Sequence, residues 1–156
     1  MLFVVCNASC ANDLKIFRHS TIVQMSILSA FTTQLVNLFD ELCTTFPEEK
    51  EIKWATEAIK GAKKINPRLI LDLFNNHVYQ DCSTIIYEKN QVAFRIMVQK
   101  KVSTQFNEML SALSIFDKHW ETMGEKNRSV IWEYLKVLCL LCEKAIAPAA
   151  KSNTVL

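Results

Sequence analysis

The sequence contains very little glycine and proline, the two residues that most often mark turns: two glycines and three prolines in 156 residues. Globular proteins contain on average about 7 % glycine and about 5 % proline. A β-sandwich or β-barrel needs a turn signal roughly every 8 to 12 residues, and this chain does not supply them. Few turns together with long periodic apolar segments predict an all-α fold.

The chain also lacks an uninterrupted apolar run of about 18 residues, the length that suggests a membrane-spanning helix. The nearest candidate, residues 21–39, is interrupted by polar residues such as Gln24, Ser29 and Gln34. The first ten residues have an apolar patch but no basic region of the kind that begins a secretory signal. We therefore expect no transmembrane segment, and a protein found in the cytoplasm of the producing cell.

Neither sign of charge is in large excess. The formal net charge is +2, half of the residues are hydrophobic and 22 % are charged. This is the composition of a folded domain rather than of a disordered chain, and it lacks the basic excess of a general nucleic-acid binder. At this length we expect one domain with a single core, which buries about 70 % of the surface of the unfolded chain.

The six cysteines include a C-x-x-C pair, Cys139 and Cys142. A zinc site needs a second pair of ligands at suitable spacing, whereas His19, His77 and His119 stand far apart in the sequence. Buried free cysteine behaves as a small hydrophobic residue. We interpret the cysteines as core residues and predict neither a metal ion nor a cofactor; a metal or redox role for the pair is the alternative.

The periodicity divides the chain into three parts. Residues 1–24 show no sustained pattern and are interpreted as an irregular N-terminal arm, or as an extension upstream of a domain that starts at Met25. Residues 25–147 are predicted to form a single-domain bundle of about five or six helices, and residues 148–156 a flexible C-terminal tail. The first strong helix is expected from about Ser26 to Thr44, where apolar residues recur every three or four positions.

Two later segments differ in how clearly they predict helix. In residues 79–101, β-branched clusters on either side of EKNQ leave a hairpin as the alternative to a helix or irregular structure, although no glycine marks a tight turn there. An apolar stripe from Val102 to Phe116 predicts a further helix, and the last helix opens after Gly124. Because the middle of that last helix is apolar nearly all round, we expect it to be central in the bundle or covered by a second chain.

The segment IKGAKKINPRLILDLF, residues 59–74, is the densest cluster of lysine, glycine and proline. We interpret it as a joint between two helices, because cations are favoured at a helix C-terminus and Asn66-Pro67 is a good start for the next helix. A phosphate-binding loop would need more glycines than Gly61 alone. The alternative is an anion site for a partner, a lipid headgroup or a nucleic-acid backbone, formed by Lys60, Lys63, Lys64 and Arg68.

Catalytic motifs are absent from the sequence. It contains no H-E-x-x-H, no G-x-S-x-G and no glycine-rich nucleotide motif, and no Glu-x-x-His of the kind found in di-iron bundles. Its carboxylates are scattered along the chain. We therefore predict no enzymatic activity, no catalytic residues and no small-molecule substrate.

Several short features occur together between residues 28 and 145: Phe46-Pro47, the joint Asn66-Pro67-Arg68, Phe74, Ile131-Trp132, and Tyr134-Leu135 with Leu138. With these features the chain resembles small helical proteins encoded by large nucleocytoplasmic DNA viruses. The resemblance implies a viral setting, in which such a protein is a capsid-associated or assembly component. It implies no catalytic residues.

The sequence as a whole predicts a non-enzymatic structural or protein-interaction module, which in a viral setting is a minor capsid or virion-assembly component. Its partners would be viral structural proteins or copies of itself. Aromatic anchors dominate interfaces, so the predicted contact residues are Trp54, Trp120, Trp132 and Tyr134, with ordinary core positions as the alternative for the tryptophans.

Two other functions remain as alternatives. One is peripheral binding of nucleic acid or of an anionic membrane through a basic rim, although the small net charge does not favour it. The residues of this rim would be Lys60, Lys63, Lys64, Arg68, Lys100 and Lys101. The other is a helical-bundle modulator of host signalling that holds a partner helix in a groove.

Overall fold

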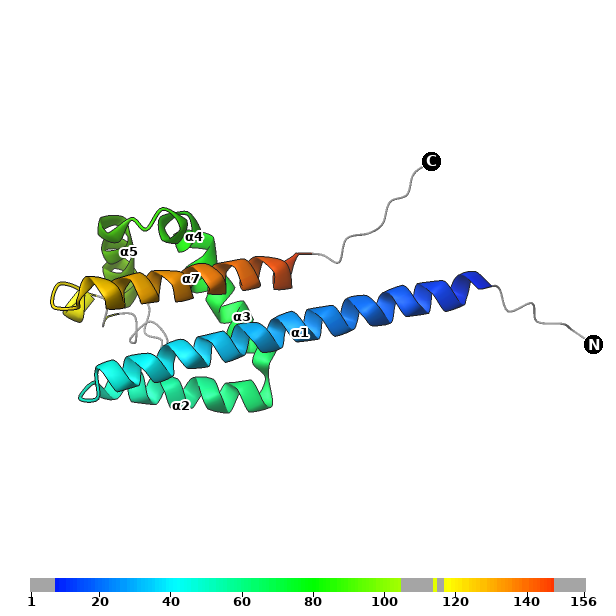
Figure 1. The fold of residues 1–156 in the computed structure, drawn as a ribbon, viewed down its shortest axis with the longest axis horizontal. Helices are drawn as coiled ribbons and strands as arrows, with labels where there is room; N and C mark the ends of the chain where they lie inside the picture. The colour runs from blue at the N-terminus through cyan, green and yellow to red at the C-terminus, as the bar shows by residue number, and fades with distance from the viewer. Residues whose placement is uncertain (1–7, 105–113, 115–116, 148–156) are drawn as a thin grey trace, which may run out of the picture.

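The computed structural model describes residues 8–104, 114 and 117–147 (Figure 1), and over these residues the chain is helical without a β-strand. This confirms the prediction of an all-α bundle of five or six helices. The elements are α1 (Ala8–Thr45), α2 (Lys50–Ile65), α3 (Pro67–Phe74), the π-helical turn η1 (Asn75–Tyr79), α4 (Gln80–Tyr87), α5 (Gln91–Thr104) and α7 (Glu125–Ile146).

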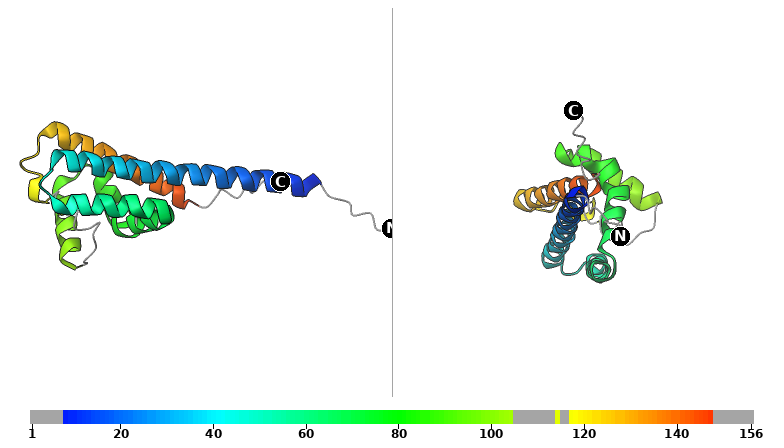
Figure 2. Two further views of the ribbon diagram at one scale, coloured as in Figure 1. Left: turned by 90° about the horizontal axis from the view of Figure 1, so that it is seen from below. Right: turned by 90° about the vertical axis from the view of Figure 1, so that its right-hand side faces the viewer.

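Three helices give the molecule its long axis. Helices α1 and α2 form an antiparallel hairpin, and α7 packs along α1 on another side (Figure 1). The shorter elements α3, η1 and α4 cross the direction of α1, α2 and α7, and α5 follows them at the side of the bundle (Figure 2). Helix α2 packs mainly on α1 and α3 among the described elements, and it lies at the edge of the molecule (Figure 1).

Aromatic side chains connect the helices at the centre of the core. Phe31 of α1 meets Phe74 of α3 edge-to-face, with ring centroids 5.2 Å apart. Trp132 of α7 meets Phe94 of α5 at 5.3 Å and Trp120 at 5.4 Å, in the same edge-to-face manner. Such pairs add to the stabilisation from burial alone, so one aromatic cluster joins α5 and α7 to the segment before Gly124.

Helix α1 corrects the prediction of an irregular arm. It begins at Ala8 and continues without a break to Thr45, and its first part projects beyond the end of α7 (Figure 1). Residues 8–45 contain no glycine or proline, and extending an existing helix costs far less than starting one. The arm therefore exists, but as helix from residue 8 onward. Residues 1–7 and the predicted tail, 148–156, lie outside the described residues.

A side chain fixes α1 where it leaves the bundle. Gln24 donates a hydrogen bond of 3.0 Å from its Nε2 to the backbone carbonyl of Ala145, in the last turn of α7. The last carbonyls of a helix have no partner within the helix. The bond therefore satisfies an open acceptor and ties the base of the arm to the C-terminal end of α7.

Part of α1, Thr21–Thr45, is long and apolar enough to cross a membrane by length and composition. A core helix of a soluble protein passes the same test, and this stretch buries Phe31, Leu35, Leu38, Phe39 and Leu42 against other elements of the chain. The expectation of no transmembrane segment stays a prediction.

Residues 79–101 form helices, so the hairpin alternative is wrong. Helix α4 ends at Tyr87, and α5 starts at Gln91 after a short turn. In that turn Lys89 adopts a left-handed backbone conformation with φ 53°, and the side chain of Asn90 accepts a hydrogen bond of 3.1 Å from the backbone N–H of Ala93. The turn thus uses lysine and asparagine where glycine is more usual. Most of the predicted helix from Val102 to Phe116 lies outside the described residues.

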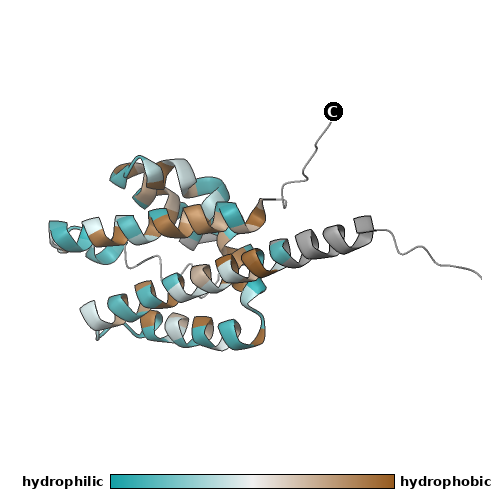
Figure 3. Ribbon diagram, turned by 45° about the vertical axis from the view of Figure 1, so that its right-hand side comes forward, coloured by the Kyte–Doolittle hydropathy of each residue, from teal (hydrophilic) through white to brown (hydrophobic). Residues whose placement is uncertain are grey.

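The joint between α2 and α3 is confirmed. Asn66 caps α3 by accepting a hydrogen bond of 3.3 Å from the backbone N–H of Leu69, and Pro67 occupies the first turn. Helix α7, predicted to be central or covered, buries one side in the core but leaves Val130, Val137 and Leu140 between 36 % and 41 % exposed. Figure 3 shows this mixture of polar and apolar residues along α7.

Candidate functional site

The predicted aromatic contact residues separate into two groups. The indoles of Trp120 and Trp132 are in the core, with 1 % and 6 % of each residue exposed, so the prediction that they form a contact surface is wrong and the core alternative holds. Trp54 is 69 % exposed. Of the three tryptophans, Trp54 is the one that is largely exposed. Trp132 contributes an edge to an open hollow of about 410 Å³ between the α4–α5 turn and the start of α7.

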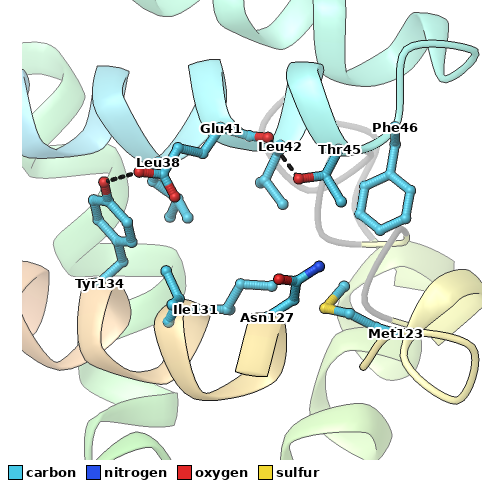
Figure 4. A pocket seen from close by; sticks show the side chains of 10 residues that line it. Leu38, Glu41, Leu42, Thr45, Phe46, Met123, Asn127, Ile131 and Tyr134 are labelled. Carbon is cyan, nitrogen blue, oxygen red and sulfur yellow. Dashed lines mark hydrogen bonds between the residues drawn. The ribbon is translucent and has the colours of Figure 1, made fainter. Parts of the chain in front are cut away.

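Tyr134 lines a small notch between α1 and α7 (Figure 4). Its hydroxyl donates a hydrogen bond of 2.7 Å to Glu41, and this bond, together with burial, raises the pKa of Tyr134 to about 12. The notch has a volume of about 100 Å³, whereas sites for drug-sized ligands measure roughly 300–1,000 Å³. It has room for about one aliphatic side chain. Its apolar lining comes from Leu38, Leu42, Phe46, Met123, Val130 and Ile131.

The four residues of the predicted anion site lie near one another in sequence, at the end of α2 and the start of α3, but most of them already have intramolecular partners. Two make ion pairs and a third donates to a hydroxyl, so the positive charge available to an external anion is reduced. Only Lys64 is exposed without such a partner in the part of the chain that the structure describes. The pairs are Lys60–Asp40 at 2.7 Å, Arg68–Asp72 at 3.1 Å and Lys63–Thr33 at 3.0 Å.

The C-x-x-C pair is part of the core. Cys139 and Cys142 are completely buried, and burial raises their pKa values to about 12 and about 11. Reactive and metal-binding cysteines are thiolates, so these thiols are poorly suited to either chemistry at neutral pH. Within the described residues no three His, Cys, Asp or Glu side chains are grouped as a metal ion would require.

Sequence reasoning missed a buried carboxylate at the turn between α1 and α2. Glu49 is 6 % exposed, and its Oε1 lies 2.6 Å from both Lys118 Nζ and His119 Nε2. The His119 ring stacks on Phe46 with centroids 4.6 Å apart. Hydrogen bonds from Lys118 and then from His119 lower the pKa of Glu49. No sequence signal connects residues about 70 positions apart, because this pairing arises only in the folded chain.

The Glu49 cluster connects the turn between α1 and α2 to Lys118 and His119, which are far away in the sequence. On the other side of the same segment, Arg95 of α5 donates to Asp117 at 3.2 Å and Glu121 at 2.8 Å. The two clusters connect residues 117–121 to the turn between α1 and α2 and to α5.

The most distinctive exposed surface lies on the outer face of α2. Trp54, Ala58, Gly61 and Ile65, which we name the α2 stripe, are spaced by four, three and four residues and therefore share one face of the helix. Trp54 and Ile65 are 69 % and 87 % exposed. The opposite face packs on the core through Ile52, Ala55, Thr56 and Ile59, and Figures 1 and 2 show α2 at the edge of the bundle.

The centre of the α2 stripe is flat because its two middle residues are small. A Cβ atom added to Gly61 would find nothing within 4 Å, so packing within the described part of the chain does not require glycine here. Glycine inside a helix costs up to about 1 kcal/mol relative to alanine. The signal for the α2 stripe in the sequence is the alternating spacing of four and three residues, but two of its four members are small, so the spacing does not stand out as an apolar pattern.

Comparison of the chain with protein-family models, curated proteins and solved structures found no match. The viral setting implied by the resemblance therefore stays a prediction, and the proposed function below depends on the surface of the molecule alone.

Proposed function

We propose that this protein is a non-enzymatic protein-interaction module that binds another protein through the α2 stripe. The observation that carries the proposal is the exposure of Trp54 and Ile65, 69 % and 87 %, at the two ends of one continuous helical face. Tryptophan is among the residues most enriched at the energetic centres of interfaces. Burying both side chains against a partner would remove a large apolar area from water.

The alignment of these residues distinguishes the α2 stripe from ordinary surface hydrophobics. Single exposed apolar residues are normal on soluble proteins, whereas a contiguous apolar patch marks an interaction site. From Trp54 to Ile65 the α2 stripe extends over three helical turns, about 16 Å. The small residues between the two large ones allow the backbone of a partner to approach closely.

A structural role in capsid or virion assembly is one form that this function can take, and it would place the protein in the virion. That setting comes from the resemblance alone. Its test is to detect the protein in purified particles of the virus whose genome encodes it, with a cytoplasmic host protein as the control for contamination.

The polyanion alternative uses the charges beside the same surface. Lys53 and Lys64 are exposed on α2 and could contact phosphates. Binding to a polyanion weakens steeply as salt rises, whereas an apolar contact persists or tightens. The host-signalling alternative needs an apolar groove that holds a helix. The notch between α1 and α7, at about 100 Å³, accommodates only about one side chain. The larger hollow beside the start of α7, at about 410 Å³, is lined mainly by polar residues.

Site-specific photo-crosslinking in cells that express the protein tests the proposal. A photoreactive phenylalanine analogue replaces exposed Lys53, next to the α2 stripe, and the matched control carries it at exposed Lys136 on α7. We expect covalent protein adducts from position 53 that persist in high salt and decrease with Trp54→Ala. Equal adducts from both positions, or adducts to lipid or nucleic acid alone, would contradict the proposal.

A further inference from the structure

The charges of α2 and its flanks are segregated along the helix. Residues 48 to 57 contain four carboxylates and two lysines, whereas residues 58 to 68 contain four cations and no carboxylate. Several of these charges are paired within the chain, among them Glu49, Lys60 and Arg68, so the charges that a partner meets are mainly those left unpaired. A helix with an acidic first half and a basic second half is complementary to a copy of itself that runs in the opposite direction. The charge pattern therefore indicates which partner the α2 stripe binds. This inference rests on the function proposed above.

Two of these charges lie directly along one edge of the α2 stripe. Glu57 precedes Ala58 and Lys64 precedes Ile65, so both occupy the same position relative to the stripe, seven residues apart. Two helical turns, about 10.5 Å, separate them, which is too far for an ion pair with each other. Both are exposed, and neither makes an ion pair within the described part of the chain.

We propose that the partner of the α2 stripe is a second copy of this chain, with the two α2 helices packed antiparallel about a two-fold axis. When Ala58 of one copy lies opposite Gly61 of the other, Trp54 lies opposite Ile65. The small residues then meet where the helices approach most closely, and the large residues pack at both ends. The spacing of four and three is the pattern that antiparallel helix pairs bury between them.

The edge charges select the antiparallel direction. In the antiparallel pair the same edges of the two helices meet, so Glu57 of each copy faces Lys64 of the other and two ion pairs form. In a parallel pair opposite edges meet, so Glu57 would face Ala62 and Lys64 would face Leu69, and no ion pair would form. Such flanking pairs set partner choice and orientation in helical assemblies.

The position of α2 leaves space for this contact. The helix lies at the edge of the bundle, and its other face carries α1 and α3 (Figure 2). A two-fold axis at the α2 stripe therefore places the two bundles on opposite sides of the helix pair. The contact also explains Gly61, since any side chain there would separate the two backbones.

Sedimentation equilibrium of the full-length chain tests the contact. The wild type is expected to show a reversible monomer–dimer equilibrium that persists in high salt. Gly61→Leu places a good helix former where the monomer has open space, so it is expected to leave monomer stability intact and to raise the dimer Kd at least about tenfold. The matched control is Lys136→Leu, which adds the same apolar side chain to an exposed position on α7 and is expected to leave the Kd unchanged.

A charge exchange tests the direction of the pair. Glu57→Lys and Lys64→Glu each replace attraction by repulsion and are each expected to raise the dimer Kd roughly tenfold at low salt. The double variant Glu57→Lys with Lys64→Glu is expected to restore wild-type affinity, because the ion pairs re-form with exchanged signs. Residues 57 and 64 do not touch within one chain, so an intramolecular effect would not give this rescue.

The outcomes separate this inference from the proposed function. A wild type that stays monomeric up to about 1 mM, or a double variant that fails to recover, would overturn the two-fold pair. If crosslinks from position 53 then join the chain to a different protein, the interaction module stands and only its partner changes. If they join it to no protein, both proposals fail.

Discussion

At the scale of single residues, Gly61 is informative because open space surrounds the point where its side chain would begin. We predict that Gly61→Ala raises the free energy of unfolding of the monomer by about 0.5–1 kcal/mol, since alanine loses less conformational entropy in a helix. Urea unfolding at a protein concentration below the dimer Kd measures it. Gly124→Ala is the comparison: Gly124 is the N-cap of α7, where alanine is a poorer residue than glycine, so the gain should be absent.

Glu49 provides a pH-dependent prediction. Its hydrogen bonds to Lys118 and His119 hold its pKa below the ordinary value of 4.5. A lowered folded-state pKa contributes stability above the unfolded-state pKa, and this contribution is lost as the pH falls through the folded-state value. Glu49→Gln should therefore reduce the free energy of unfolding by about 1.5–3 kcal/mol at neutral pH and by much less in acid.

The measurement is chemical unfolding of wild type and Glu49→Gln at about pH 7 and about pH 3. Glu133→Gln is the control, because the ion pair of Glu133 with Lys89 is more than half exposed on the carboxylate side and exposed pairs contribute little. A difference for Glu49→Gln that is equally large at both pH values would show that geometry, and not the charge of Glu49, holds the segment.

At the scale of elements, the turn between α4 and α5 places a lysine in a backbone conformation that favours glycine. Lys89 has φ 53°, a conformation that costs most residues about 1 kcal/mol and glycine almost nothing. Lys89→Gly should therefore be more stable than Lys89→Ala by about 1 kcal/mol, although both lose the ion pair to Glu133. Thermal unfolding of the two variants side by side gives the difference. Equal stabilities would mean that the turn readjusts when the lysine is removed.

Local chemistry predicted some element boundaries well. Asn66-Pro67 marks the start of α3 because a cap and a fixed φ act through neighbouring atoms only, and the structure shows both. The start of α1 was wrong by many residues, because residues 8 to 24 lack apolar periodicity but also lack helix breakers. The hairpin alternative at EKNQ depended on β-branched residues, whose preference for strands is readily overridden by packing against other helices.

The candidate site was predictable in part. Trp54 lies about half a turn away from the buried face formed by Ile52, Ala55 and Ile59, so its exposure follows from the helical pattern of α2 alone. Trp120 sits where the chain is about to turn, and its burial depends on contacts with Trp132 that no local pattern specifies. The Glu49 cluster was not predictable, since its members come together only through the path of the chain.

At the scale of the whole molecule, the alkylation rates of the buried cysteines measure how often the folded chain unfolds. Burial raises the pKa of Cys82 to about 11 and of Cys139 to about 12, and a thiol reacts as the thiolate. We predict that Cys82, Cys139 and Cys142 become alkylated together, at a rate set by global unfolding. Peptide mass mapping over time measures each rate. Half-buried Cys43 is the internal comparison and should react earlier; early reaction of Cys139 alone would reveal local opening of α7.

Helix α1 has 38 residues and is therefore about 57 Å long, and only part of that length is braced by the bundle (Figure 1). It runs opposite to α2 within one chain, so an antiparallel α2 pair would aim the two free lengths of α1 in opposite directions. The resulting dimer would be elongated, with the two bundles in the middle and the free length of one α1 helix projecting at each end. Its maximum dimension in solution scattering would far exceed that of a compact dimer of the same mass. An assembly built from such dimers would be spaced by the length of α1 rather than by the width of the bundle.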